Sequence, residues 1–276
     1  MVQALNEADL VTTTTPELKE RLGQFNENVV VLENYLDDAL WQLRKPVIKT
    51  DDQRPLIIGY MGSESHQTDL EYLLPVITSL MARYTDALEF HFWGIKPPPE
   101  IANAPQVKWI PAVSYDYEDF AEYFQTQYAD IFIAPLVDNP FNRAKSPLKF
   151  FEYSTLGAPG VYSNVTTFER AVTHEHDGYL ASSLNDWHKY LLMLIEDGDL
   201  RQEIARNAQE TIQEKWLLSK NAYRWREAYE QAKQKQNQQA VPRKKDFKWV
   251  KSINQRYYSL IEDQKETTRS LNKELA

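Results

Sequence analysis

One stretch of the sequence, from Ala129 to Ser163, constrains the fold more than any other. It contains two short apolar runs, Ile131–Ile133 and Val161–Ser163, with the length and composition of buried strands. Helix start and stop signals lie between them, so the stretch predicts a strand, a loop, a helix and a second strand. The loop, residues 136–145, then opens at the carboxyl end of a strand. Ligands bind at that edge of an open α/β sheet.

The two ends of the predicted helix are marked by four residues. Ser146 is suited to cap the helix, and Pro147 suits its first position, where the missing N–H is not needed. Gly157 stands where a left-handed C-terminal residue is expected, and Pro159 follows two residues later. The helix is therefore expected to begin close to Lys145 and to end before Gly157.

Charged residues at the start of this helix indicate an anion site. Lys145 and Lys149 bracket a helix N-terminus whose free N–H groups already favour a phosphate or pyrophosphate. Glu152 follows on the same side of the helix as Leu148 and Lys149, and its carboxylate could accept hydrogen bonds from two sugar hydroxyls. The alternative is a surface salt bridge between Lys149 and Glu152, which is worth only a few tenths of a kcal/mol.

A second polar turn follows an earlier apolar run. Leu56–Tyr60 predicts a buried strand, and Gly62, Ser63 and His66 lie in the turn that leads into a helix ending near Arg83. The glycine allows backbone to approach a ligand, and the helix N-terminus offers a second place for an anion. An ordinary connection between strand and helix is the alternative. Gly-Lys-Ser/Thr and Gly-x-Gly-x-x-Gly motifs are both missing from this turn.

Strand and helix signals alternate through the central region. This alternation predicts an α/β fold with a Rossmann-like parallel sheet and helices on both faces. The remaining strands are expected at 88–93, 107–110 and 178–180, and the remaining helices at 117–127, 166–172 and 184–196.

The two ends of the chain have a different pattern. Residues 1–50 predict strands at 8–12 and 29–32 around a helix from Thr15 to Leu22, and residues 50–54 form a polar linker. Residues 201–276 are expected to be mainly helical, with 51–200 as the domain between them. Apolar stripes support the helices, whereas Gln234–Gln239 is expected to be a linker and 246–275 a further helix. The stripes are Leu200, Ile204, Ala208 and Ile212, then Ala222, Trp225, Ala228 and Tyr229.

Composition narrows the functional classes. The 276 residues are 42% hydrophobic and 26% charged, as in an ordinary globular protein, and the net charge of -9 argues against nucleic acid as a partner. The absence of cysteine excludes disulfides and thiolate chemistry and fits a cytoplasmic location. No apolar run reaches eighteen residues, and we expect neither a membrane span nor a signal peptide. His174 and His176 supply only two ligands, so no metal site is expected, and His66 is the better functional candidate.

The segment KSPLKFFEYSTLGAPGVYS resembles the donor-site helix of retaining glycosyltransferases with the GT-B fold, the "group 1" or family-four class. Many members carry two glutamates separated by seven residues, followed by a small-Gly-x-Pro turn. Glu152 matches the second glutamate, which the resemblance implies binds a ribose, whereas the first falls at Ala144. A subgroup reads Phe-Asn-x-x-Lys-Ser-x-x-Lys instead, which Phe141, Asn142, Lys145, Ser146 and Lys149 match.

Two further segments extend the resemblance to roughly residues 8–225. GYMGSESHQTDLEYLLPVI is similar to the first loop of the donor domain, although the arginine and lysine that many members carry there are missing. The resemblance therefore implies that Lys145 and Lys149 bear the charge facing the diphosphate. ADLVTTTTPELKERL and VVVLENYLDDALW resemble the end of the acceptor domain and the hinge, so the chain is expected to be the C-terminal half of a GT-B enzyme. From the residues alone, an N-terminal β-α extension of a single domain is an equally acceptable interpretation.

The resemblance implies a function. Such an enzyme transfers a sugar from a nucleotide diphosphate sugar to a saccharide, lipid or protein acceptor with retention, typically in polysaccharide biosynthesis, and needs no cofactor or metal. An acceptor-domain partner chain would complete it. A non-catalytic module that binds nucleotide sugars is the main alternative, suggested by Ala144, and a sugar-nucleotide epimerase of the same fold is a weaker one.

Overall fold

The computed structural model describes residues 2–46, 54–112 and 116–238. Residues 1–232 belong to one compact unit, and residues 233–276 to a second. Of the second unit only the end of one helix is described. The predicted helix at 246–275 and most of the predicted linker at 50–54 lie outside the described residues.

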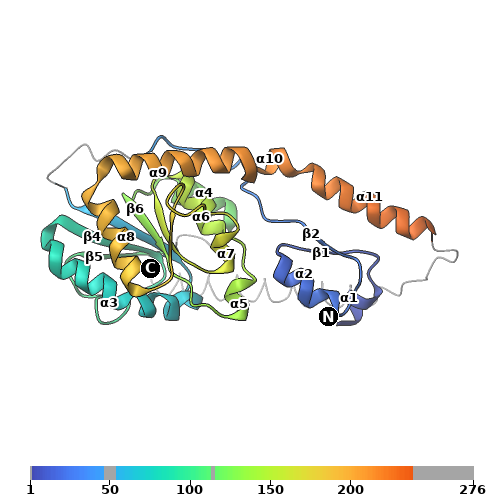
Figure 1. Cartoon of the computed structure of the whole chain (residues 1–276), viewed down its shortest axis with the longest axis horizontal. Coiled ribbons are helices and arrows are strands. Elements are labelled where there is room, and N and C mark those ends of the chain that lie inside the picture. Colours follow the sequence, from blue (N-terminus) through green and yellow to red (C-terminus); the bar gives the residue numbers. More distant parts are fainter. Residues whose placement is uncertain (1, 47–53, 113–115, 239–276) are drawn as a thin grey trace, which may run out of the picture. The chain divides into compact units, whose positions relative to one another are not determined.

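The centre of the first unit is a parallel sheet of six strands (Figure 1). Its order, β5-β4-β3-β6-β7-β8, places the first strand of the central region in the middle of the sheet. The neighbouring strands are parallel throughout. The strands are β3 (Leu56–Gly62), β4 (Leu88–Gly94), β5 (Val107–Pro111), β6 (Ile131–Ala134), β7 (Gly160–Ser163) and β8 (Tyr179–Ala181).

Each face of the sheet builds its own hydrophobic core. In β6, Ile131 and Ile133 pack into the core beneath α3 (Gln67–Tyr84) and α8 (Leu184–Glu196), because alternate residues of a strand face opposite sides. Phe132 and Ala134 pack into the other core with α4 (Tyr117–Phe124) and α6 (Leu148–Thr155). The predicted α/β sheet with helices on both faces is thus confirmed (Figure 1).

Three shorter elements complete the central region. A 3₁₀ turn at Glu64–His66 leads into α3, and α5 (Pro140–Arg143) and α7 (Thr166–Glu169) are single turns in loops. The sequence reading missed α5, which begins because the side chain of Asn139 accepts a hydrogen bond from the N–H of Asn142 at 2.8 Å. The predicted helix at 117–127 ends three residues earlier, at Phe124.

The start of α6 differs from the prediction by one position. Pro147 is the N-cap residue rather than the first helical residue, and no side chain caps the helix. Ser146 instead accepts a hydrogen bond from Asn34 Nδ2 at 3.0 Å, because a segment far away in the sequence reaches its hydroxyl. The predicted capping role of Ser146 is therefore wrong, whereas the left-handed conformation of Gly157, with φ of 73°, is confirmed.

The N-terminal residues form a small β-α-β arrangement. The helix α1 (Val2–Glu7) comes first in the chain. β1 (Val11–Thr13) and β2 (Val29–Val31) then pair in parallel, and α2 (Pro16–Gly23) connects them. Thr15 caps α2 by accepting a hydrogen bond from the N–H of Leu18 at 3.3 Å. Both predicted strands and the predicted helix are confirmed within one to three residues at their ends.

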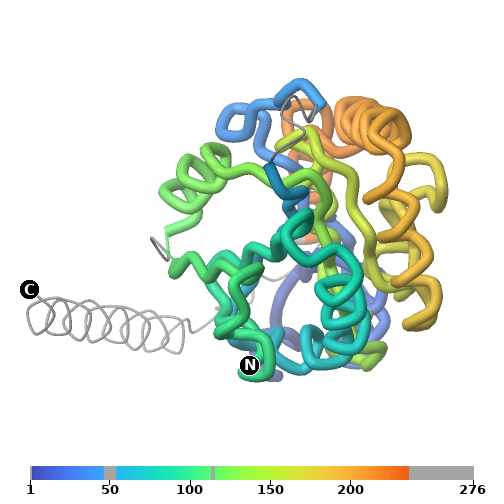
Figure 2. Tube along the Cα trace, turned by 90° about the vertical axis from the view of Figure 1, so that its left-hand side faces the viewer, coloured from blue at the N-terminus to red at the C-terminus, as the bar shows by residue number. Residues whose placement is uncertain are grey.

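The C-terminal helices are α9 (Gly198–Thr211), a π-helical turn at Ile212–Trp216, α10 (Leu218–Asn221) and α11 (Tyr223–Gln238). α9 follows α8 directly and runs at an angle to it (Figure 1 and Figure 2). Ile204, Ala208 and Ile212 of the predicted stripe are buried. Tyr229 is 71% exposed and Ala222 is exposed as well, so their assignment to the second stripe is wrong, whereas Ala228 is buried. The linker predicted from Gln234 is helical as far as Gln238.

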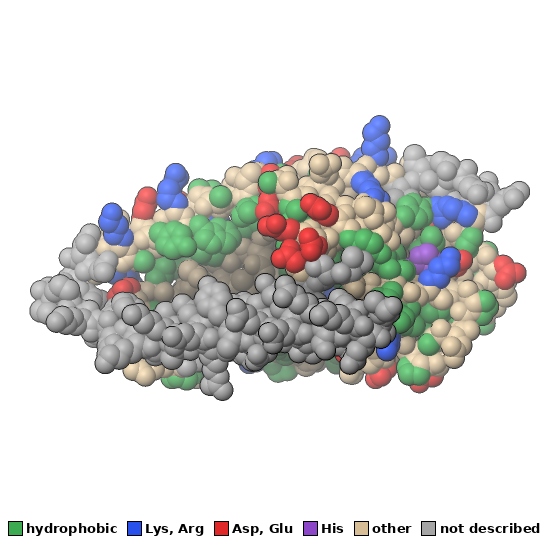
Figure 3. Space-filling view, turned by 180° about the vertical axis from the view of Figure 1, so that it is seen from behind, with side chains coloured by type: hydrophobic (Ala, Val, Ile, Leu, Met, Phe, Trp, Pro, Cys, Tyr) green, Lys and Arg blue, Asp and Glu red, His purple; other side chains and the backbone are tan. Residues whose placement is uncertain are grey.

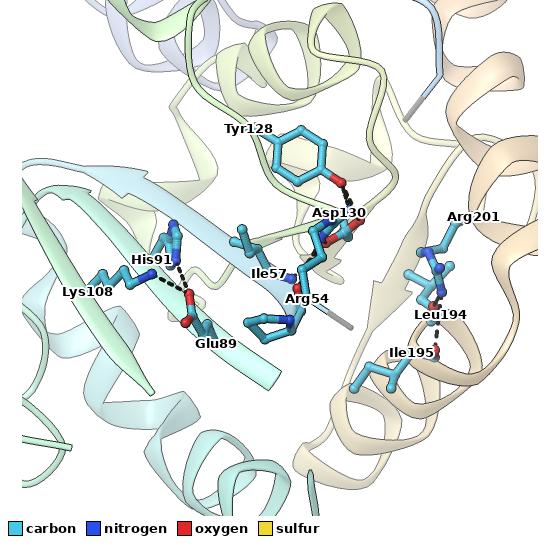
Figure 4. Close-up of polar contacts among 11 residues, drawn as sticks. Arg54, Ile57, Glu89, His91, Lys108, Tyr128, Asp130, Leu194, Ile195 and Arg201 are labelled. Atoms are coloured by element: carbon cyan, nitrogen blue, oxygen red, sulfur yellow. Dashed lines mark hydrogen bonds and ion pairs between the residues drawn. The ribbon is translucent and has the colours of Figure 1, made fainter. Parts of the chain in front are cut away.

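A polar network closes the edge of the sheet where the strands begin (Figure 4). The buried Asp130, just before β6, forms an ion pair of 2.8 Å with Arg54, which precedes β3. Its carboxylate also accepts hydrogen bonds from the Tyr128 hydroxyl at 2.6 Å and from the N–H of Ile57 at 2.8 Å. These contacts lower the pKa of Asp130 against the opposing effect of burial, and they join two central strands at the edge remote from the predicted site.

Lysine and arginine side chains do not cluster among the coloured atoms of the face shown in Figure 3. Acidic side chains gather near the centre of this face, while lysine and arginine side chains are scattered among the coloured atoms. α4 and the residue before it contribute exposed acidic side chains, namely Asp116, Glu118, Asp119 and Glu122. The described side chains on this face therefore form no continuous basic surface.

Replacement of Gly157 by alanine should destabilise the protein. A Cβ atom at this position would lie 2.5 Å from the backbone oxygen of Lys45, and the left-handed backbone alone costs a residue with a side chain about 1–2 kcal/mol. We expect the free energy of unfolding, measured by urea titration of tryptophan fluorescence, to fall by at least that amount. Gly23→Ala is the control, because a Cβ there meets nothing within 4 Å. Equal effects of the two changes would contradict this prediction.

Candidate functional site

A cleft of about 860 Å³ opens at the carboxyl ends of β3, β4 and β6. The turn after β3, the loop after α5 and the first turns of α6 form its floor, and α4 forms one wall. The sequence-predicted residues converge on it from two segments about eighty residues apart. Those that line the cleft are Gly62, Ser63, His66, Lys145, Ser146, Leu148, Lys149 and Glu152.

Asn142 is the one predicted site residue that does not line the cleft. Its side chain is buried, and Nδ2 donates a hydrogen bond of 2.8 Å to the carbonyl oxygen of Val137. The short helix α5 turns this side chain toward the protein interior. Asn142 therefore stabilises the loop after β6 through a buried hydrogen bond and does not face the cleft.

The two lysines approach the cleft over aromatic rings. Lys149 Nζ lies 5.5 Å from the centre of the Tyr60 ring, and Lys145 Nζ lies 4.8 Å from that of Phe141. Burial lowers the pKa of both amines, to about 8 for Lys149, where the Glu152 carboxylate opposes the effect. The site thus holds two closely spaced cations that are only partly hydrated, a state that favours an anionic ligand.

Glu152 is buried, with 5% of its surface exposed, and so is not part of a surface salt bridge. Among the described residues no ion pair within 4.0 Å joins it to Lys149. Burial raises its pKa to about 7, and the nearby Lys149 and a hydrogen bond with Tyr117 oppose this rise. The carboxylate therefore lies inside the cleft in surroundings that favour its neutral form more than water does.

Tyr117 is a site residue that the sequence reading did not single out. Its hydroxyl accepts a hydrogen bond from Trp41 Nε1 at 3.1 Å, and its interaction with Glu152 lowers the pKa of that carboxylate. Burial raises the pKa of this hydroxyl to about 12, with the Glu152 charge adding to the rise. Tyr117 begins an aromatic-rich helix, but nothing in the local sequence indicates that it faces α6.

Asp69 is a second residue that the sequence reading missed. Its buried carboxylate contacts His66 Nδ1 at 2.7 Å and accepts a hydrogen bond from the N–H of Val137 at 2.7 Å. The spacing of His66 and Asp69, three residues apart at a helix start, could have indicated the first contact. The second contact joins the turn after β3 to the loop after β6.

One wall of the cleft is aromatic. Besides Tyr117, four aromatic side chains from β4 and α4 line it, and the centroid of the Phe124 ring lies 5.8 Å from that of Trp93 and 5.4 Å from that of Phe120. Flat apolar surfaces of this kind accept planar organic groups. These side chains are Trp93, Phe120, Tyr123 and Phe124.

The N-terminal segment supplies the remaining wall. Thr14 and Asn34 line the cleft, and the hydroxyl of Thr15 donates a hydrogen bond of 3.1 Å to the carbonyl oxygen of Ala144. An ion pair between Arg170 and Glu17 adds a second connection to the same region. Ala144 itself lines the cleft, so no carboxylate stands at the place where the resembled motif has its first glutamate.

The described residues include no cluster of three or more histidine, aspartate or glutamate side chains able to hold a metal ion. Within the same residues, no helix combines the length and apolar character that crossing a bilayer requires. His174, considered in the sequence as a ligand, instead contacts the Tyr190 hydroxyl at 3.2 Å through Nε2 and accepts a hydrogen bond from the N–H of Leu180 through Nδ1.

The fold and the cleft define an α/β protein with a lysine-lined cleft at the carboxyl edge of a parallel sheet. The profile of the family described as "Glycosyl transferases group 1" matches residues 55–197, just over half of the chain. The chain belongs to this family of enzymes. A search of curated proteins gave no match.

Solved structures with the same fold include three glycosyltransferases of the GT-B type. TarM from S. aureus is 16% identical, with a TM-score of 0.62 over 83% of this chain and 45% of its own. HepE from Anabaena, in complex with UDP-glucose, is 16% identical, with a TM-score of 0.63 over 83% and 66%. Sucrose-phosphate synthase from Thermosynechococcus elongatus is 16% identical, with a TM-score of 0.59 over 83% and 60%. This chain thus spans less than two thirds of each of these proteins.

Loss of the Tyr117 hydroxyl should raise the pKa of Glu152. A hydrogen bond to a charged group contributes about 1.5–3 kcal/mol, and about 1.4 kcal/mol corresponds to one pH unit, so Tyr117→Phe should shift the titration by about one to two pH units. Carbon NMR of protein labelled at the glutamate carboxyls measures this, with Glu152→Gln assigning the signal. Tyr123→Phe, the same change on the same helix, is the control. An unchanged titration in Tyr117→Phe would show that the hydroxyl does not support the carboxylate.

Proposed function

We propose that this chain is the donor-binding part of a glycosyltransferase that takes a sugar from a nucleotide diphosphate sugar and transfers it with retention. Its family supports a glycosyltransferase, and the complex of HepE with UDP-glucose supports a nucleotide sugar as donor. The acceptor we propose is a saccharide, lipid or protein hydroxyl that approaches from the side of the N-terminal segment.

One observation carries the proposal. Within the region that matches the family, Lys145, Lys149 and Glu152 converge on a single cleft at the carboxyl edge of the sheet. The lysines suit a diphosphate and the buried carboxylate suits the two hydroxyls of a ribose. The aromatic wall from β4 and α4 offers a surface for the planar base.

The proposed reaction breaks the bond between the sugar's anomeric carbon and the oxygen of the diphosphate. The bonding electrons leave with the diphosphate, so negative charge grows next to Lys145 and Lys149 as the bond breaks. Cations fixed in advance stabilise this charge more than they stabilise the bound donor, which accelerates the reaction. The acceptor oxygen forms the new bond and its proton leaves to the departing phosphate or to water.

A second candidate is a module that binds nucleotide sugars without turnover. Ala144 favours it, because this residue lines the cleft where many family members have a glutamate. The carbonyl of Ala144 is also occupied by the Thr15 hydroxyl, which places the N-terminal segment against this wall. Binding without transfer would support this candidate.

Replacing either lysine by methionine should weaken diphosphate binding. Methionine keeps much of the apolar stem and removes the charge, and a charge-assisted hydrogen bond contributes about 1.5–3 kcal/mol, which corresponds to roughly tenfold or more in affinity. Titration calorimetry with UDP, GDP and ADP measures this effect for Lys145→Met and Lys149→Met. Lys96→Met is the matched control, because that amine lies 5.3 Å from the centre of the Trp109 ring and is not among the residues that line the cleft. Equal affinities in all variants would remove both lysines from the site.

The test of the proposed function combines binding with turnover. The chain is titrated with UDP-glucose, GDP-mannose and ADP-glucose, and mass spectrometry then follows donor consumption with and without sugar acceptors. Glu152→Ala should weaken nucleotide binding by about 1.5–3 kcal/mol and hardly affect free pyrophosphate, since the carboxylate faces the ribose. Absence of binding to any nucleotide would overturn the proposal. Binding without consumption would favour the second candidate.

A further inference from the structure

His66 stands between a buried carboxylate and the cleft. Its Nδ1 lies 2.7 Å from Asp69 Oδ2, and its side chain is 12% exposed. The described contacts engage Nδ1 and leave Nε2 as the ring nitrogen available to a ligand. His66 lines the cleft together with Lys145 and Lys149.

Asp69 is itself held from the opposite loop. Oδ1 accepts hydrogen bonds from the N–H of Val137 at 2.7 Å and from Asn142 Nδ2 at 3.4 Å, and the carboxylate is buried. These hydrogen bonds fix the orientation of the carboxylate. The Asp69 carboxylate therefore orients the imidazole so that Nδ1–H donates to it. Nε2 is then the nitrogen that carries a proton in the imidazolium and none in the neutral ring.

The charges around His66 act in opposite directions. The hydrogen bond to Asp69 favours the imidazolium, but burial and the positive charges of Lys149 and Lys145 outweigh it and lower the pKa of His66. The lowered pKa thus favours the neutral ring, which presents a lone pair at Nε2. A phosphate oxygen would meet repulsion there unless the ring gained a proton.

We propose, on the basis of the proposed function, that His66 is a third diphosphate-binding group whose Nε2 takes up a proton from solvent when the donor binds, and that Asp69 is the residue that positions it. The added proton forms an N–H bond and then a hydrogen bond to a phosphate oxygen, and no other bond changes. The imidazolium takes the place of a basic residue missing from the turn after β3.

Proton uptake gives binding a characteristic pH dependence. The negative diphosphate offsets the two lysines and stabilises the imidazolium, so the pKa of His66 is higher in the complex than in the free protein. Binding is then tightest at low pH and weakens as pH rises through the interval between the two pKa values. Other ionisable groups also line the cleft and contribute their own pH dependence, namely Glu64, Asp116, Tyr117, Lys145, Lys149 and Glu152.

The choice of probe keeps the ligand's own charge constant. A nucleoside diphosphate changes charge at about pH 6 as its terminal phosphate titrates, as a phosphomonoester does. UDP-glucose, GDP-mannose and ADP-glucose lack a terminal phosphate, so we use whichever of the three binds. Calorimetry in two buffers with different ionisation enthalpies then counts the protons taken up on binding.

Wild-type protein should take up protons near pH 7, and its affinity should fall about threefold to tenfold between about pH 6 and pH 8, the range in which histidine changes charge. His66→Asn should lose most of the uptake and most of this slope. His188→Asn is the matched control, because that ring lies on α8 and contacts Ser79 at 3.4 Å. Equal uptake in wild type and His66→Asn would overturn the inference, while binding itself would still support the proposed function.

Asp69→Asn tests the positioning role. A neutral amide can donate to Nδ1, which moves the ring proton to Nε2, so the variant should still bind the donor but take up few protons. Nitrogen NMR of the His66 ring in wild-type protein provides a measurement that does not depend on this variant folding. The spectrum should show an Nδ1–H tautomer in the free protein and an imidazolium in the complex. An Nε2–H tautomer in the free protein, or a ring that stays neutral on binding, would overturn the proposal, and failure of all three donors to bind would remove it together with the proposed function.

Discussion

The buried carboxylate of Asp69 is the contact on which the geometry of the site depends. It contacts His66 in the turn after β3 and accepts the N–H of Val137 in the loop after β6. These loops follow two adjacent strands of a parallel sheet, and the register of the strands brings their carboxyl ends together but does not fix the loops. A charged group in a buried place is stable only when hydrogen bonds replace its water, so the two loops are held at the distance this carboxylate requires. The same contact orients the imidazole that faces the cleft.

Burial disfavours the charged forms of the lysine and glutamate side chains in the site, and their neighbours partly offset this effect. Lys149 and Glu152 are both shifted toward their neutral forms, and each partly offsets the effect of burial on the other. The Tyr117 hydroxyl supports the carboxylate, and the rings of Tyr60 and Phe141 lie beneath the amines. A ligand that brings negative charge to the amines and hydroxyl groups to the carboxylate would replace the hydration that these side chains have lost. Electrostatics and fold therefore favour the same class of ligand.

The N-terminal segment is part of the site's construction. Trp41 donates to Tyr117, Asn34 donates to Ser146 and Thr15 donates to the carbonyl of Ala144, so three side chains of this segment contact the walls of the cleft. The GT-B structures that share this fold are longer than this chain, which covers 45–66% of the three compared. A change in how the N-terminal segment packs would reach Glu152 through a single intervening side chain, Tyr117. This arrangement links the acceptor side of the proposed enzyme to its donor site.

The succession of the longer strands and helices, the parallel sheet and the two segments that line the cleft could all be predicted from the sequence. Local signals were sufficient, because strand alternation, the left-handed Gly157 and the lysines around a helix start depend on neighbouring residues only. The packed structure was needed to find that Asp69 and Tyr117 belong to the site. It also shows that the side chain of Asn142 is buried, and that Ser146 accepts a hydrogen bond from Asn34 instead of capping α6. Each of these contacts, apart from the one between His66 and Asp69, joins residues that are far apart in the chain or depends on a short helix with weak local signals. Burial, which sets the ionisation of Lys149 and Glu152, is likewise a property of the packed molecule, because it depends on what every neighbouring element excludes from water.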